Sequence, residues 1–140
     1  MIQRIQSLFL ILNDVIFVVL FFVPFMVIFD NKGEQFGRRF TLADYVPALI
    51  GEIVIVVIAG FALVLFKDRK KQMKVCMIGM VISVLYAVGL AAIPFILNGD
   101  KSSFSTYQTA SGTYIACAHF VLFLLARIFI KRDEDLVQSV

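Results

Sequence analysis

The stretch FKDRKKQMK, residues 66–74, lies between two long apolar runs and carries five of the 13 Lys and Arg residues of the chain. So many charges in a row cannot continue an apolar run, and the stretch therefore divides the protein into two halves. Each half contains two apolar runs, and the basic stretch is adjacent to one run of each half. Because basic loops remain on one side of a membrane, the charge of this stretch predicts the orientation of the apolar runs in both halves.

The composition is typical of a membrane protein. Of the 140 residues, 61% are hydrophobic and 16% are charged, whereas a soluble domain is about 45–50% apolar. A globule of this size has too much surface to bury such an excess, so lipid is the expected surrounding. The net charge of +3 is modest, and the basic residues gather near the ends of the apolar runs. We therefore expect no nucleic acid among the partners.

Each of the four apolar runs is about as long as the 20 residues that a helix needs to cross a bilayer. Pro24 is expected to kink the outer third of the first helix, and residues 35–41 are expected to form a short extended segment. The predicted spans are residues 7–29, 45–66, 75–97 and 112–130, with outer loops at 30–44 and 98–111 and a basic inner loop at 67–74. The whole chain, residues 1–140, is expected to be one transmembrane domain.

The distribution of positive charge predicts the orientation. Four spans place both termini on the same side. That side holds Arg4, five basic residues of the central stretch, and Arg127, Lys131 and Arg132, which makes nine. The opposite side holds four: Lys32, Arg38, Arg39 and Lys101. Because basic loops stay in the cytoplasm, we expect both termini to be cytoplasmic. Together with the four apolar runs, this predicts an all-α fold, an integral membrane antiparallel four-helix bundle.

Small residues recur every four positions in the third span, at Gly79, Ser83, Ala87 and Ala91. Residues four apart share one face of a helix, and small residues allow a second helix to approach closely in a membrane. We expect this helix-packing stripe to contact another helix of the same chain. The alternative is a contact between two copies of the protein.

Four ionisable residues lie within the predicted spans, and such residues usually face the interior of a bundle. At about 1.5 Å per residue, Asp14 and Arg127 lie about 10 and 5 Å from the inner ends of their helices. Glu52 and His119 lie about 9 and 10 Å from the outer ends. Matching by depth predicts two intramembrane polar pairs, Asp14 with Arg127 and Glu52 with His119. Each pair either fastens helices together or lines a path for protons or ions, and Arg127 alternatively reaches to the inner surface.

A set of basic residues is expected to gather on the inner face, where it would contact lipid head groups or a protein partner. Its members are Arg4, Lys67, Arg69, Lys70, Lys71, Lys74, Lys131 and Arg132. No catalytic motif is found. With a single His, and with Cys76 and Cys117 far apart and without other ligands near them, neither a metal site nor a cofactor is expected.

Three stretches resemble a known family: MIQRIQSL at residues 1–8, LFKDRKKQMKVC at 65–76 and LARIFIKRDEDLV at 125–137. They are similar to the small four-helix membrane proteins of Bacteroidota described as domain of unknown function 4293. The chain departs from that pattern in its ending, residues 138–140, and in lacking an Asn between Ala126 and Arg127. The resemblance implies four spans and a bacterial inner membrane, and it brings no activity and no catalytic residue.

The function expected from these features is that of a non-enzymatic, multi-pass protein of the inner (cytoplasmic) membrane, acting as an accessory or assembly subunit of a larger membrane complex. Its expected partners are membrane lipid and either a second protein or further copies of itself. One alternative is a small ion- or proton-coupled transporter that uses the intramembrane Asp14, Glu52 and His119. Another is a regulator that binds anionic lipid through the basic inner loop.

Overall fold

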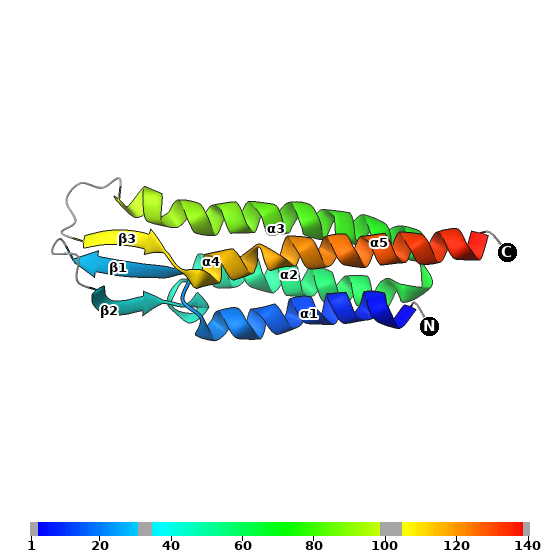
Figure 1. The fold of residues 1–140 in the computed structure, drawn as a ribbon, viewed down its shortest axis with the longest axis horizontal. Coiled ribbons are helices and arrows are strands. Elements are labelled where there is room, and N and C mark those ends of the chain that lie inside the picture. Colours follow the sequence, from blue (N-terminus) through cyan, green and yellow to red (C-terminus); the bar gives the residue numbers. More distant parts are fainter. Residues whose placement is uncertain (1–2, 31–34, 99–104, 139–140) are drawn as a thin grey trace.

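Four long helices lie side by side along the long axis of the molecule (Figure 1). The computed structural model describes residues 3–30, 35–98 and 105–138. Both termini lie at one end of the molecule, and a small sheet extends the opposite end (Figure 1). The helices are α1 (Gln3–Phe22), α2 (Val46–Val64), α3 (Arg69–Asn98), the short α4 (Ser111–Ala116) and α5 (Ala118–Gln138).

Four helical segments are long and apolar enough to cross a membrane. Between 22% and 33% of the residues in their most apolar windows are buried inside the protein, so most of their apolar side chains face outward. Such exposure would be unfavourable in water and is normal in lipid. The four long apolar helices confirm the prediction that the fold is mainly helical. The segments are Ile5–Phe22, Val46–Lys67, Arg69–Leu97 and Ser111–Gln138.

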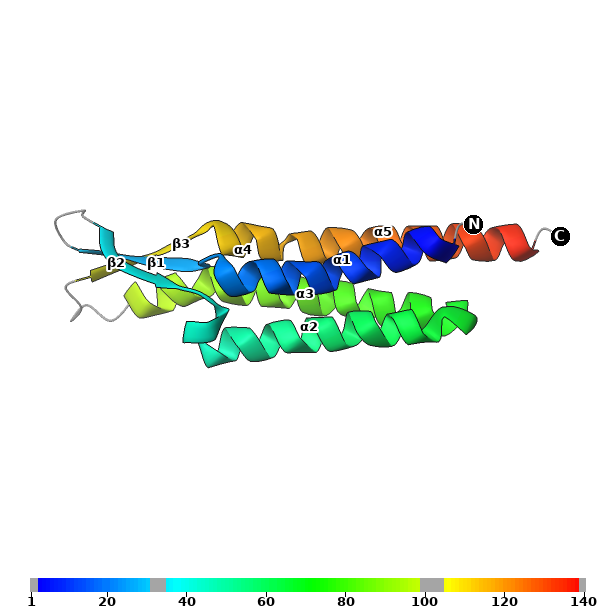
Figure 2. The same ribbon diagram turned by 90° about the horizontal axis from the view of Figure 1, so that it is seen from below.

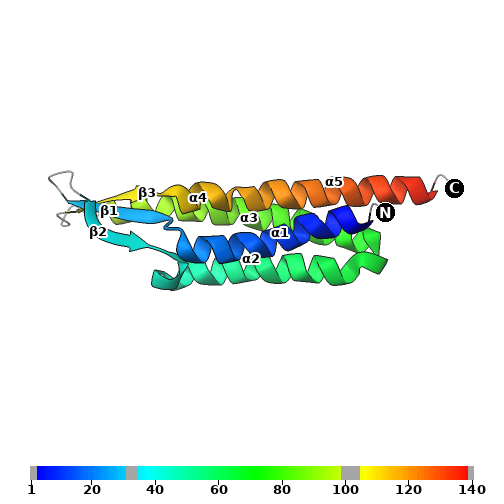
Figure 3. The ribbon, with the colours of Figure 1, turned by 60° about the horizontal axis from the view of Figure 1, so that its bottom comes forward.

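The helices pack in a ring, in which α1 contacts α2 and α5, and α3 contacts the same two helices. Figures 1 and 3 agree with this order, with α1 beside α2 and α5 beside α3. In this ring α2 and α5 lie diagonally opposite each other. Any side-chain contact between them must therefore cross the interior of the bundle.

The first helix ends earlier than predicted, because α1 stops at Phe22 and the chain turns at Pro24. The predicted span of residues 7–29 is wrong in its last part, where Met26–Asp30 forms strand β1. Pro24 has no N–H to donate and disfavours helical geometry in the residue before it. The N–H of Phe25 then donates to the carbonyl of Phe40 at 2.9 Å, which starts the pairing of two strands.

Strand β1 is the centre of a three-stranded antiparallel sheet of order β2-β1-β3. Strand β2 covers Gln35–Phe40 and β3 covers Ser105–Thr109. The expected extended segment at residues 35–41 agrees with β2, whereas β1 and β3 were not expected, and the outer loops 30–44 and 98–111 thus contain strands. Figure 2 shows the sheet at the end of the molecule away from both termini, beyond α1 and α2 and beside the last turns of α3, which contact β3.

The turn between α1 and β1 is fastened to the beginning of α4. The N–H groups of Ala110 and Gly112 donate to the carbonyls of Phe25 and Pro24 at 2.8 and 2.9 Å. The buried hydroxyl of Thr113 also donates to the Phe25 carbonyl, at 2.9 Å. The carbonyls of Pro24 and Phe25 in this turn are therefore paired, as burial requires.

The connection between α2 and α3 is shorter than the predicted inner loop of residues 67–74. A 3-10 helix, Leu65–Lys67, leads into Asp68, and α3 begins at Arg69. The carboxylate of Asp68 accepts a hydrogen bond from the N–H of Lys71 at 3.2 Å, so it caps the first turn of α3. Hydrogen bonds from the side chain and backbone of Lys71 lower the pKa of Asp68. Most of the basic stretch thus lies on a helix.

The fourth predicted span, residues 112–130, is interrupted and extended. It divides at Cys117, which forms a tight turn between α4 and α5. The N–H of Cys117 donates to the carbonyl of Tyr114 at 3.2 Å. Helix α5 then continues to Gln138. The prediction ended with the apolar run, but charged residues such as Lys, Arg and Glu also favour a helix.

Two apolar clusters form the core, one toward the termini and one toward the sheet. The first surrounds Phe123 and contains Leu10 and Ile55. The second contains Leu20, Phe25, Met26, Ala48 and Ala116. On α1 and α2, and from α4 to α5, the residues of the first cluster are separated from those of the second by a few positions. Buried polar residues occupy those positions.

The small-residue stripe of α3 lies partly inside the bundle. Gly79 and Ser83 are buried, and Ala87 and Ala91 are half-buried. A Cβ atom added at Gly79 would lie 2.7 Å from the ring of Phe123 on α5. At this position the stripe therefore makes room for an aromatic ring of the same chain.

We expect Gly79→Ala to lower the free energy of unfolding by about 1–3 kcal/mol, because the new methyl group would overlap the enclosed Phe123 ring. Gly89→Ala is the matched control on the same helix, since a Cβ at Gly89 meets nothing within 4 Å. It should leave stability unchanged or raise it slightly. Unfolding by SDS in mixed micelles, followed by circular dichroism, measures both. Equal effects of the two substitutions would contradict this account of the packing.

Candidate functional site

Three buried polar side chains form a layer between the two apolar clusters. Asn13 comes from α1, Glu52 from α2 and His119 from α5, and each is 0% exposed. The layer is thus built by three helices, two of which lie diagonally opposite in the ring. We call these three residues the polar layer.

The imidazole of His119 bridges the other two side chains. Its Nε2 lies 2.7 Å from Oε1 of Glu52, and its Nδ1 lies 2.8 Å from Oδ1 of Asn13. The amide nitrogen of Asn13 donates to the carbonyl of Phe9, one helical turn away, at 3.1 Å. That bond orients the amide with its oxygen toward His119.

Helix α3 adds one polar neighbour to the polar layer. From α3 the hydroxyl of Tyr86 donates to the Ala48 carbonyl at 3.2 Å and lies close enough to Glu52 to interact with it. Gly51 makes room for this ring, since a Cβ there would lie 2.7 Å from it. Oε2 of Glu52 has no hydrogen-bond partner among the described residues.

The predicted pairs have different outcomes. Glu52 and His119 contact each other at 2.7 Å. Asp14 and Arg127 form no ion pair with each other: Asp14 interacts electrostatically with His119, and Arg127 with Cys76 on α3. The depth estimate matched Asp14 with Arg127, whereas in the structure Asp14 lies near His119, because the adjacent Asn13 contacts that ring.

Asn13 is the residue of this site that was missed in the sequence. It stands beside Asp14 in an apolar run, and this polar interruption was the available signal. Successive residues on a helix point about 100° apart, so a carboxylate and its neighbouring amide face different neighbours. Only the packing of α1 decides which of the two faces His119.

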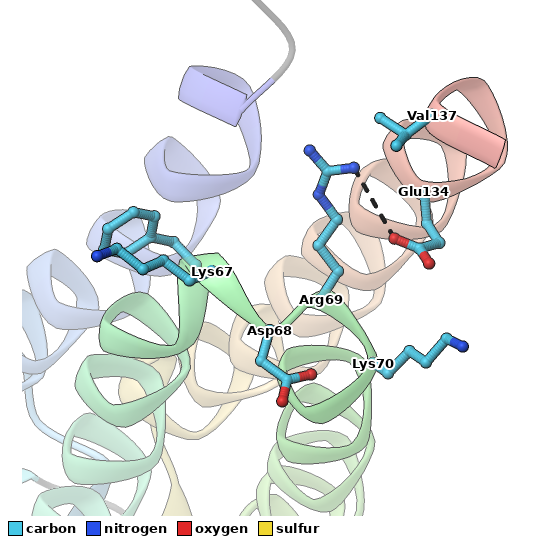
Figure 4. Close-up of a pocket in the computed structure, with 7 residues that line it drawn as sticks. Lys67, Asp68, Arg69, Lys70, Glu134 and Val137 are labelled. Carbon is cyan, nitrogen blue, oxygen red and sulfur yellow. Dashed lines mark ion pairs between the residues drawn. The ribbon is translucent and has the colours of Figure 1, made fainter. Parts of the chain in front are cut away.

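A second polar site lies at the end of the molecule that carries the termini. A cleft of about 580 Å³ is lined by Phe66, Lys67, Asp68, Arg69, Lys70, Glu134 and Val137. It lies between the turn that joins α2 to α3 and the last turns of α5 (Figure 4). We call it the terminal cleft.

Arg69 fastens α3 to α5 beside this cleft. Its guanidinium lies 3.0 Å from a carboxylate oxygen of Asp133 and 3.8 Å from one of Glu134. Figure 4 shows Arg69 reaching toward Glu134, whereas Lys67 and Lys70 point away from each other. The ammonium group of Lys67 lies 5.8 Å from the centre of the Phe66 ring. The cations around the cleft therefore do not converge on one point.

The predicted inner-face residues gather near this end, but they differ in their surroundings. Arg69 is paired with α5, and Lys71 is paired with Asp68 at 2.9 Å. The side chain of Arg4 lies outside the described residues. The others are exposed: Lys67, Lys70, Lys74, Lys131 and Arg132.

In the described part of the chain, no three His, Cys, Asp or Glu side chains are grouped so that they could hold a metal ion. Cys76 is buried, Cys117 is exposed, and both are free thiols.

We expect His119→Leu to lower the free energy of unfolding by about 3–5 kcal/mol, because it leaves the buried Glu52 without its partner. The double variant Glu52→Met/His119→Leu should lose less than His119→Leu alone, since it buries no unpaired carboxyl group. Unfolding by SDS in mixed micelles measures the single and double variants. Additive losses would mean that the two side chains do not interact.

Comparison with known proteins identifies a family. A model of the family described as "Domain of unknown function (DUF4293)" matches residues 2–140. No match was found among curated proteins or among solved structures. Because the match covers nearly the whole chain, the protein belongs to the DUF4293 family.

Proposed function

We propose that the protein is an antiparallel four-helix bundle in a bacterial inner membrane, with both termini in the cytoplasm. The four apolar helices support this proposal, since each is long enough to cross a bilayer. The termini and the basic stretch lie at the same end (Figure 1), and that end carries nine of the 13 Lys and Arg residues. Basic segments remain in the cytoplasm during insertion.

We further propose that it is a non-enzymatic accessory or assembly subunit of a larger membrane complex. The observation that carries this proposal is the projection of α5 beyond the ends of the other helices (Figures 1 and 2). Its last turns contribute Glu134 and Val137 to the terminal cleft and expose Lys131 and Arg132. A partner protein could insert a side chain into the cleft and place acidic residues against the basic residues of the projecting helix.

The rigid attachment of α5 supports the same role. The ion pairs of Arg69 with Asp133 and Glu134 hold the projecting helix against α3. Binding a partner to a surface that is already ordered avoids the entropic cost of ordering it. The proposed partner is a larger protein whose acidic cytoplasmic surface lies close to the membrane.

The first test is purification from native membranes in a mild detergent, followed by mass spectrometry. We expect a larger membrane protein to be recovered in a fixed ratio with this chain. Arg132→Glu should weaken that recovery about tenfold, equivalent to about 1.4 kcal/mol, because it places like charges against the acidic partner.

Arg39→Glu is the matched control, since Arg39 is an exposed arginine on β2, at the opposite end of the molecule. It should leave the recovery unchanged. Recovery of this chain alone, or with further copies of itself, would contradict the proposed role.

Proton- or ion-coupled transport is the second candidate, favoured by the contact between Glu52 and His119 inside the bundle. Ionisable residues within spans often belong to transport pathways. If the protein transports protons or ions, the double variant Glu52→Gln/His119→Gln should abolish flux in liposomes while the bundle remains folded. Flux that is absent from the wild type, or unchanged in the double variant, would exclude this role.

A further inference from the structure

The hydrogen bonds of the polar layer determine where one proton must be. The amide nitrogen of Asn13 is committed to the Phe9 carbonyl, so its oxygen faces Nδ1 of His119 at 2.8 Å. An amide oxygen only accepts hydrogen bonds. Nδ1 of His119 must therefore carry a hydrogen, which leaves Nε2 as the nitrogen whose protonation varies.

The contact between Nε2 and Oε1 of Glu52, at 2.7 Å, requires a single hydrogen between the two atoms. With none, two lone pairs would face each other and the pair would carry a buried negative charge. With two, one hydrogen would have to move to Oε2, which has no hydrogen-bond partner among the described residues, and the pair would be positive. With one, its net charge is zero, whether the hydrogen is on the carboxyl group or on the imidazole.

We propose that Glu52 and His119 form an intramembrane proton-binding site that holds one shared proton, with Asn13 as the residue that fixes the orientation of the imidazole. The neutral pair can be buried among apolar residues, whereas a net charge would be unfavourable there. This inference does not depend on the accessory role or on transport, because it concerns only the proton that the folded bundle holds.

Two other titratable groups face this site. Asp14 approaches His119 from α1, and Tyr86 approaches Glu52 from α3. Tyr86 donates to the Ala48 carbonyl and Ser83 donates to the Met80 carbonyl, so the single hydrogen of each of these α3 hydroxyls goes to the backbone. Gain or loss of a proton would therefore leave the buried pair with a net charge.

The chain contains one histidine, so labelling histidine with ¹⁵N reports on His119 alone. The experiment uses the full chain in vesicles of phosphatidylcholine and phosphatidylglycerol, with NMR spectra recorded between about pH 5 and pH 8, the range in which an ordinary histidine titrates. We expect Nδ1 to carry a hydrogen at every pH, with no titration step of the ring.

Variants separate the shared proton from a merely buried histidine. Asn13→Leu removes the acceptor at Nδ1, so the ring should no longer be held in the Nδ1–H form, and a second signal from Nε2–H should appear. Val15→Leu is the control on the same helix, at an exposed apolar position, and should keep the wild-type spectrum. The wild-type measurement decides the proposal even if Asn13→Leu fails to fold. A wild-type ring protonated only at Nε2, or one that titrates near its ordinary pKa of about 6.5, would overturn it.

Discussion

The hydrogen-bonded bridge from Glu52 through His119 to Asn13 is the constraint on which the arrangement of the helices depends. It joins α2 to α5 across the bundle and adds α1 to the same contact. Apolar side chains in lipid have little preference for one neighbour over another, because the lipid is as apolar as they are. A polar group in the same place needs a specific partner. The bridge therefore sets both the rotation and the relative height of three helices.

The two apolar clusters are arranged around that bridge. Phe123 packs against the small residue Gly79 on one side, and Phe25 and Met26 fill the cluster near the sheet on the other. The break at Pro24 makes the second cluster possible, because it turns the chain out of α1 and into β1. Every backbone group in lipid must be paired. In the proposed orientation, the sheet accordingly lies beyond α1 and α2 and beside the end of α3, on the outer side of the membrane.

The opposite end of the bundle is organised by charge. Asp68 is the single residue between the 3-10 helix and α3, and its carboxylate caps the first turn of α3. Most of the basic stretch is therefore helical and not part of a loop. Arg69 then pairs with the acidic residues of α5. Basic residues near the membrane can thus have two separate roles: one set joins helices, and another remains exposed for lipid or a protein partner.

The sequence by itself determined four apolar helices, because length and apolar content are local properties. It also placed Glu52 and His119 at equal depth, and their contact follows that match. The tertiary structure decided which polar side chains meet, since rotation about each helix axis depends on packing against the others. It chose Asn13 over Asp14 as the partner that accepts from His119, and it left Arg127 beside Cys76. It also decided the sheet, because β1 pairs with β3, a segment far away in the chain, and no local pattern in either strand specifies that partner.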